Sequence, residues 1–424
     1  MSLLAFLAPL LFFLPGQVFV VGPGPGEIPE IQTAIDAATD GDFVLVKSGN
    51  YLSFVVPNRS LTIAADAGAT VNVIGAIRAR NLSASRSIVF SGLSAQGFAS
   101  TNDADANGLH LVNCTGPVTL QDCTLRGFDS LACAPEPGLG ALVESSSAVV
   151  FERCALTGTS SHSGETHAVY TDPNADGLRA TNSSIAMYSS AARGGGGALA
   201  CLGYVGDGQP GGDGADLSNC TLVAQDSTFV GGRRGNGDSF SGQNYGGNGG
   251  QGLLLRDSPS TVTLYASTAQ GGLPGSGTCI PFCCTCTEGW GGSSVANVNG
   301  SSVTASADPA RDLLLAAVAR ESTSVNLATQ GVVGDVVALR ISRTPTSQVY
   351  APLHGVVTTV ATTVPERMIL LGTMSSTTLA STLPLGPVPV ASANVLRLQS
   401  LHLASDGTRW LGDPRVLVVL DSIY

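Results

Sequence analysis

A seven-residue phrase that returns along the chain constrains its fold more than any other feature of the sequence. A weak copy at residues 91–97 is followed by five clear copies, at residues 121–127, 152–158, 188–194, 225–231 and 265–271. They run from Gln-Asp-Cys-Thr-Leu-Arg-Gly to Tyr-Ala-Ser-Thr-Ala-Gln-Gly, and their closing glycines are 30 to 40 residues apart. One such unit is too small to bury its own apolar residues, so equivalent segments of successive units are expected to lie side by side.

A second short strand precedes each phrase and opens on a small residue. Residues 108–111 (Gly-Leu-His-Leu) and 214–217 (Gly-Ala-Asp-Leu) are examples, and a polar turn joins each strand to its phrase. Nothing between the strands has a helical period, which excludes alternating strand and helix units. The pattern predicts an all-β protein in which at least six coils, between about residues 40 and 304, stack as parallel rungs about 4.8 Å apart.

The third and fifth positions of the phrase share one face of a strand, because side chains alternate between faces. The third position holds cysteine or serine and the fifth holds an apolar residue or alanine. We expect these positions to form two ladders inside the coil. Cys123 and Cys154 are therefore predicted to be neighbouring, inward-pointing packed thiols.

Asparagine recurs at the turn before the phrase, at Asn113, Asn182 and Asn219. Each begins an Asn-x-Ser/Thr sequence, which would accept a glycan in a eukaryotic secretory pathway. Asparagine also tolerates the left-handed backbone conformation, and its amide can hydrogen-bond from rung to rung. We favour this structural role for the asparagines.

The start of the repeats carries a pattern of its own. Ile31, Ala34, Ile35 and Ala38 fall on one helical stripe, which predicts a short helix over residues 30–38 that covers the open end of the coils. The pattern of residues 31–51 resembles the N-terminal cap of pectin-lyase-like right-handed parallel β-helix proteins. The resemblance covers residues 18–304 and implies a right-handed parallel β-helix, but fold does not imply function.

The phrase ends near residue 304, and residues 305–424 have a different pattern. Apolar strands are expected at 336–341, 367–371, 394–398 and 415–420, with a hairpin turn at 405–408. The pattern predicts a smaller C-terminal β-sandwich-like domain. Such a domain would cover the C-terminal end of the coils or attach the protein to another component.

The N-terminus and the cysteines both indicate export. Residues 1–14 form an apolar run ended by Pro15 and Gly16. Residues 1–17 are predicted to be a signal peptide, and no membrane span is expected after its removal. Ten cysteines suit an oxidising compartment, and the cluster within 279–286 is expected to contain at least one disulfide. We therefore expect a secreted or cell-surface protein. A net charge of −11 argues against nucleic acid as a partner.

Long segments follow the phrases at the same point of each coil, so we expect them to leave the coils on one face. Loops on a rigid scaffold often carry function. The third of these segments holds the candidate functional residues His162, Glu165, His167, Asp172 and Asp176. Asp103 and Asp105, in the first segment, are weak candidates for Ca²⁺ binding. No other metal and no cofactor is predicted.

Two functions of different classes are compatible with these features. Exposed glycine-rich loops favour a structural or binding module whose partners are polysaccharides or cell-surface components. The family resemblance also allows a polysaccharide lyase or a glycoside hydrolase, and a hydrolase would need two carboxyl groups across a bound sugar. The chain has no Asp-Asp, Gly-His-Gly or Arg-x-Lys sequence of the polygalacturonase type. The binding module is therefore the preferred prediction and the enzyme the alternative.

Overall fold

The computed structural model is built almost entirely of β-strands, which confirms the prediction of an all-β protein. It describes residues 16–98, 106–128, 138–160, 175–197, 210–234, 247–275, 290–343, 345–349, 354–359 and 367–424. These ranges contain one helix, α1 (Ile31–Ala37), and the strands β1 to β34. Within them, no helix has the length and apolar character needed to cross a membrane.

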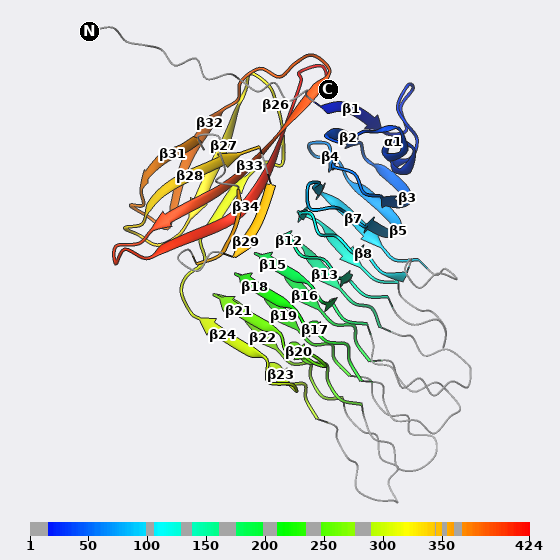
Figure 1. Cartoon of the computed structure of the whole chain (residues 1–424), viewed down its shortest axis with the longest axis vertical. Coiled ribbons are helices and arrows are strands. Elements are labelled where there is room, and N and C mark those ends of the chain that lie inside the picture. The colour runs from blue at the N-terminus through cyan, green and yellow to red at the C-terminus, as the bar shows by residue number, and fades with distance from the viewer. Residues whose placement is uncertain are drawn as a thin grey trace, which may run out of the picture.

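Strands β1 to β24 form the part that we call the coil stack, and one row of its strands makes up most of the first sheet (Figure 1). From β1 to β24, every neighbouring pair in this row is parallel. The row contains, in order, β1 (Gly16–Val21), β2 (Asp42–Val46), β4 (Leu61–Ala65), β6 (Ile88–Ser91), β9 (Val118–Gln121), β12 (Val149–Glu152), β15 (Ser184–Tyr188), β18 (Thr221–Gln225), β21 (Thr261–Tyr265) and β24 (Ser302–Ser306).

Two further rows meet at one long strand, β5 (Val71–Arg80), which also pairs with β3 (Gly49–Val56). The row beginning at the first half of β5 contains β7 (Leu93–Gln96), β10 (Thr124–Arg126), β13 (Ala155–Thr157), β16 (Ala191–Arg193), β19 (Thr228–Val230) and β22 (Thr268–Gln270). The row beginning at its second half contains β8 (Leu109–Val112), β11 (Ala141–Glu144), β14 (Leu178–Thr181), β17 (Ala215–Ser218), β20 (Leu253–Leu255) and β23 (Val295–Asn297).

The six phrases occupy equivalent places in the stack, as predicted. In β7 to β22 the fifth phrase positions are direct partners, for example Leu125 with Leu156 and Ala192 with Phe229. These side chains are buried in one continuous apolar core that runs through the stack. Stacking therefore buries what a single unit could not.

Serine and cysteine form the predicted ladder at the third phrase position. Cys123 and Cys154 are free, buried and adjacent, since Ala155 N–H donates to the Cys123 carbonyl. Further along, Ser190 Oγ accepts from Cys154 N–H at 3.0 Å, and Ser227 Oγ accepts from Ser190 N–H at 3.3 Å. Each hydroxyl satisfies a backbone N–H that the turn leaves unpaired, which explains why a small polar residue is tolerated in the core.

The turn asparagines adopt the structural role that we favoured. Asn113, Asn182 and Asn219 all have φ between 51° and 54°. Asn219 Nδ2 donates to Asn182 Oδ1 at 2.8 Å, so the amides bond from rung to rung. A left-handed φ is costly for most residues and cheap for asparagine.

The predicted helix is present as α1, slightly shorter than expected. Ile31, Ala34, Ile35 and Ala38 are all buried and belong to the apolar core of the stack. The apolar stripe of the helix thus packs against the first coils. Ala34 and its neighbours cover the end of the core that no further coil covers.

The C-terminal layer, residues 308–424, has two sheets around its own apolar cluster. The smaller sheet contains β25 (Asp312–Leu315), β27 (Ser324–Gln330) and β32 (Thr378–Pro384). The larger is formed by β26 (Val318–Arg320), β28 (Val336–Ser342), β31 (Arg367–Thr373), β33 (Ser392–Leu403) and β34 (Arg409–Leu420). A separate pair is formed by β29 (Pro345–Val349) and β30 (Val356–Thr359). The cluster includes Leu313, Leu327, Leu339 and Leu417, and β33 and β34 form the predicted hairpin.

The C-terminal layer lies along the side of the coil stack and returns to its N-terminal end (Figure 1). Strand β33 pairs antiparallel with β1, through Gly16 with Ala393 and Gln17 with Ser392, so the large sheets of the two parts are continuous. The expectation that this layer would cover the C-terminal end of the coils is therefore wrong. At the N-terminal end, the open edge of β1 offers unpaired backbone groups, and β33 extends the ladder there.

The first residue of each clear phrase contacts the C-terminal layer. The sequence did not predict these contacts. Gln121 exchanges two hydrogen bonds with the backbone of Val416, at 3.1 and 2.7 Å. The Tyr188 hydroxyl accepts from Val356 N–H at 2.8 Å. Gln225 Nε2 donates to the Arg311 carbonyl at 2.9 Å.

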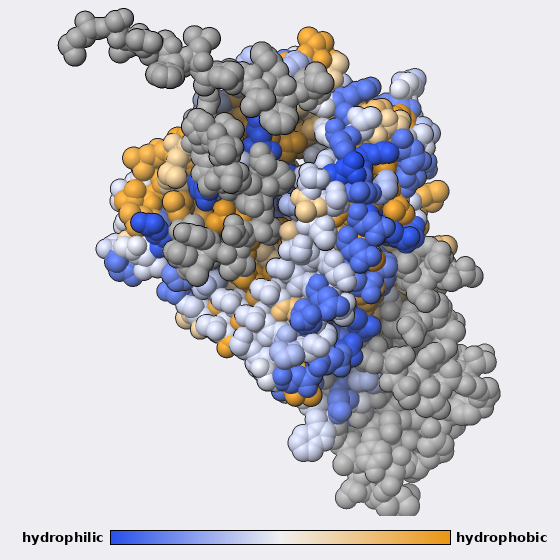
Figure 2. Space-filling view, viewed as in Figure 1, coloured by the Kyte–Doolittle hydropathy of each residue, from blue (hydrophilic) through white to orange (hydrophobic). Residues whose placement is uncertain are grey.

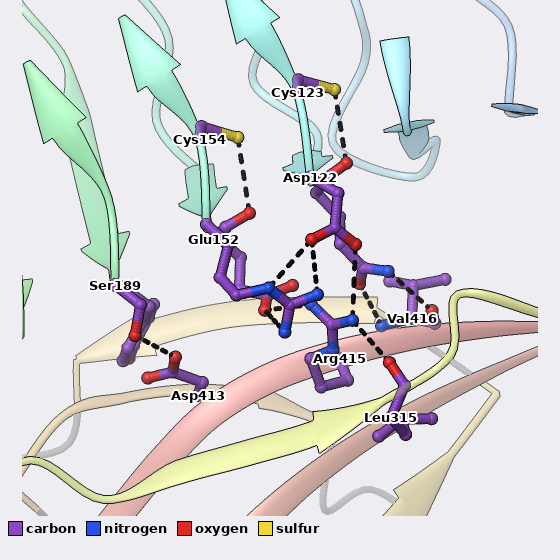
Figure 3. A network of polar contacts seen from close by, with 12 residues as sticks. Asp122, Cys123, Glu152, Cys154, Ser189, Leu315, Asp413, Arg415 and Val416 are labelled. Atoms are coloured by element: carbon purple, nitrogen blue, oxygen red, sulfur yellow. Dashed lines mark hydrogen bonds and ion pairs between the residues drawn. The ribbon is translucent and has the colours of Figure 1, made fainter. Parts of the chain in front are cut away.

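The other two first positions use charge and aromatic contact. Glu152 is fully buried and bonds to Arg415, which also donates to the Leu315 carbonyl at 2.8 Å (Figure 3). Tyr265 packs edge-on against Trp410, with ring centroids 5.6 Å apart. One column of the stack, with one residue from each of five successive coils, therefore contacts the C-terminal layer.

The outer side of the C-terminal layer is apolar in places. Met368, Ile369 and Leu370 of β31 are exposed, and Figure 2 shows apolar colour over this edge of the molecule. Strand β31 pairs with β28 alone within the described residues.

Candidate functional site

Most of the candidate residues named from the sequence lie outside the described residues. This is so for His162, Glu165, His167 and Asp172, for the calcium candidates Asp103 and Asp105, and for the cysteines of 279–286. Asp176 is described, as are the two ends of each long segment. The structure therefore shows where each long segment leaves the coil stack and where it returns, and we call these points the roots of the segment.

The closing glycines of the phrases form a single column, as predicted. Gly127 N–H donates to the Thr157 carbonyl, Gly158 N–H to Arg193 and Gly194 N–H to Val230, and each acceptor immediately precedes the next closing glycine. Gly97 and Gly231 continue the same pattern. Each following segment therefore starts from the same side of the stack.

Beyond this column, outgoing and returning chain segments alternate in a hydrogen-bonded ladder that we call the glycine lattice. Its members are Gly195, Gly212, Gly232, Gly250, Gly272 and Gly292. For every member from Gly212 to Gly292, the backbone N–H donates to the carbonyl oxygen of the preceding member, at N···O distances of 2.7 to 3.0 Å. Two segments per coil are thereby locked to one another and to the coils above and below.

Only glycine fits in this lattice. A Cβ atom on Gly250 would lie 1.9 Å from the Gly212 carbonyl oxygen, and one on Gly292 would lie 1.8 Å from that of Gly250. The neighbour Gly291 is outside the lattice, and its Cβ would be 3.6 Å from the nearest atom, in Pro274. The abundance of glycine in the later segments thus has a packing cause at their roots, in addition to any flexibility.

A row of polar side chains lies where the segments return to the stack. Asp176 Oδ1 accepts from Asp213 N–H at 2.8 Å, Asp213 Oδ1 from Gln251 N–H at 2.5 Å, and Gln251 Oε1 from Ser293 N–H at 2.5 Å. Asn107 Oδ1 likewise accepts a hydrogen bond from Leu139 N–H at 2.9 Å. These side chains cap the backbone of the next coil, and this is the place that the structure assigns to Asp176, which is buried.

Two arginines neutralise part of this row. Arg179 pairs with Asp176 at 2.7 Å and with Asp216 at 3.5 Å, while Arg256 pairs with Asp216 at 2.5 Å. Burial and then the neighbouring Asp176 carboxylate raise the pKa of Asp213 to about 7 and that of Asp216 to about 6. Near neutral pH, Asp213 is therefore partly protonated, and Asp216 is mostly ionised.

Asp216 was not predicted as a site residue. Its strand, residues 214–217, was recognised, and the alternation of side chains places Ala215 and Leu217 inside and Asp216 outside. That alternation was the sequence signal that could have indicated Asp216 as a candidate. The pairing of Asp216 with Arg179 and Arg256 depends on the register of three coils and could not be derived from one.

A groove lies elsewhere, between the coil stack and the C-terminal layer. Its volume is about 850 Å³, and it is lined by Arg153 and by residues of β25, β27 and β32. None of the site residues named from the sequence lines it. Its walls are mainly aliphatic and neutral, since Leu314, Leu315 and Leu327 contribute without any carboxylate.

No metal site emerges from the part of the chain that the structure describes. No group of three or more His, Cys, Asp or Glu side chains there is arranged to hold an ion. The sulfur atoms of Cys114, Cys123, Cys154 and Cys220 are buried, and burial raises the pKa of the Cys114, Cys154 and Cys220 thiols, which keeps these sulfurs in the unreactive form.

Comparison with known proteins yields little. No protein-family model matches the chain, and no curated protein matches it. A superoxide reductase (neelaredoxin) from Ignicoccus hospitalis is 10% identical over 26% of this chain and 80% of its own, with a TM-score of 0.17. The receptor-binding domain of the siphovirus 9NA tailspike is 12% identical over 91% of this chain and 96% of its own, also with a TM-score of 0.17. At these TM-scores neither likeness supports an inference about fold or function.

Proposed function

We propose that the chain is an exported right-handed parallel β-helix of the pectin-lyase-like type that acts as a structural and binding module. The strands of successive coils pair in parallel and in register, which supports the β-helix. In this proposal the C-terminal layer braces one side of the β-helix, and the segments rooted in the glycine lattice form the binding surface on another. The partners are polysaccharides or components of a cell surface.

The glycine lattice is the observation that carries the proposal. It ties two chain segments per coil into one hydrogen-bonded array, so that the segments beyond it start from fixed positions in a regular row. Segments that start at regular positions suit an extended, repeating ligand such as a glycan chain, because equivalent contacts could recur at each coil. A deep apolar pocket is not needed for this mode of binding.

Glycan-array binding of the purified chain tests this function. The double variant Glu165→Ala/Asp172→Ala should lose at least ten-fold in affinity for any glycan that the parent binds. The matched control is Asp36→Ala on the exposed side of α1, remote from the lattice, which should bind like the parent. Absence of binding to all glycans and to cell surfaces, or full binding by the double variant, would contradict the proposal.

A second candidate function is that of a carbohydrate-active hydrolase. It is favoured by the Asp176, Asp213 and Asp216 row, in which Asp213 has a pKa of about 7 and could hold a proton at neutral pH, as a general acid must. A screen for release of reducing ends from polysaccharides tests it. Activity that Asp213→Asn abolishes while glycan binding persists would establish the enzyme over the binding module.

A further inference from the structure

One arginine is buried between the coil stack and the C-terminal layer without a counter-charge among the described residues. Arg397 lies in β33, where its neighbours across the sheet are Ser342 of β28 and Val416 of β34. Only 7% of its surface is exposed. The alternation of β33 places it with Ala393 and Val395, which pack against the outward face of the first coils.

Within the part of the chain that the structure describes, the guanidinium of Arg397 has one hydrogen-bond partner. Nη2 donates to Ser87 Oγ at 3.4 Å, and Nε and Nη1 have no acceptor there. Burial lowers the pKa of Arg397 to about 10, and no carboxylate of the described residues opposes this shift. A buried cation with free donors is costly unless an anion accompanies it.

Two other buried arginines of this interface show the usual arrangement. Arg415 bonds to Glu152 and lies 3.4 Å from Asp122, and Arg311 donates to Asp335 at 3.1 Å. Both are therefore neutralised by side chains of the protein itself. Arg397 is also buried, but no carboxylate of the described residues pairs with it.

We propose that Arg397 holds a small inorganic anion, of which chloride is the simplest, between β33 and the start of β6. The unpaired Nε and Nη1 atoms of the guanidinium and the Ser87 hydroxyl are the donors. The near-complete burial of the side chain limits the ligand to a small ion. The anion would complete the contact between the C-terminal layer and the first coils, independently of the binding function proposed above.

Thermal unfolding at constant ionic strength tests the proposal. When sodium gluconate is replaced by sodium chloride or bromide, the midpoint of the parent should rise by a few degrees and then saturate, because the ion binds the folded state only. The variant Arg397→Met should not respond to the anion. The matched control Arg193→Met removes an exposed arginine of β16 and should respond like the parent.

Bromide-soaked crystals of the unaltered chain provide a test that needs no variant. An anomalous peak beside Arg397 Nε and Nη1 is expected. Equal midpoints for the parent in gluconate, chloride and bromide, the absence of that peak, or an anion response that survives in Arg397→Met would each overturn the proposal.

Discussion

Two sides of the same coil stack differ in the residues that they use: large polar side chains on one side and glycine on the other. On the covered side, the first phrase position supplies large polar residues, such as Gln121, Glu152 and Tyr188, which are fully buried against the C-terminal layer. On the loop side, the closing phrase position is always glycine, and further glycines form the lattice. A single seven-residue phrase therefore supplies one anchoring residue and one glycine root per coil.

The comparison shows how a repeat can serve two interfaces at once. Stability on the covered side depends on specific pairs, and each pair involves a different residue of the C-terminal layer. Stability on the loop side depends on backbone contacts that are the same in every coil. Substitutions should therefore act individually on the covered side, whereas on the loop side they should act by steric exclusion.

The largest effect is expected at Arg415. Arg415→Met leaves Glu152 buried with Arg153 as its remaining ion-pair partner, and breaking one side of a buried pair costs about 3–5 kcal/mol. Chemical denaturation would measure this loss. Arg409→Met, on the exposed start of the same strand, should change the free energy of unfolding by less than about 0.5 kcal/mol. An equally small effect for both variants would show that the covered side does not depend on this pair.

A pH-dependent difference should come from Glu152. Burial, opposed by Arg415 and Arg153, raises its pKa from 4.5 to about 7, so the folded state binds this proton more tightly than the unfolded state. Its contribution to stability is full below about pH 4.5, falls as the pH rises and is lost above about pH 7.

Glu152→Gln should remove this dependence. The free energy of unfolding of the parent minus that of Glu152→Gln should fall by roughly 3 kcal/mol between pH 4.5 and 7 and then level off. His402, whose pKa burial lowers to about 4, changes stability in the opposite direction but is common to both proteins. A difference that stays constant with pH, or rises, would show that Glu152 remains ionised.

The loop side is tested by one glycine inside the glycine lattice and one glycine outside it. Gly250→Ala places a Cβ 1.9 Å from the Gly212 carbonyl and should cost roughly 2 kcal/mol or more, because backbone has to move. Gly291→Ala meets nothing closer than 3.6 Å and should be neutral. Denaturant midpoints of the two variants would separate them. Equal midpoints would mean that the lattice is not a close-packed array.

The smallest effect is expected inside the coil, which both sides share. Ser190→Ala removes the acceptor of Cys154 N–H and should cost about 1 kcal/mol. Ser147→Ala, at an exposed turn, is the control and should have almost no effect. Hydrogen exchange at the Cys154 amide should accelerate only in Ser190→Ala, and acceleration in both variants would contradict a local role.

The coil stack was predictable in detail, whereas the candidate site was predictable only in part. The period of the phrase placed Cys123 beside Cys154 and aligned Gly127 with Gly158, because stacking repeats the same local conformation in each coil. Asp176 was named as a functional candidate, and its burial against the next coil came from the structure. Asp216 was missed because its partners lie on other coils.

The sequence by itself determined the local elements: the strands, the left-handed turns at Asn113 and Asn182, and the capping helix. These depend on alternation, turn preference and helical period, which act over a few residues. The tertiary structure alone decided where the C-terminal layer packs. The contact of Glu152 with Arg415 joins residues that are 263 positions apart. No local pattern encodes such a pair, since it exists only when two separately formed surfaces meet.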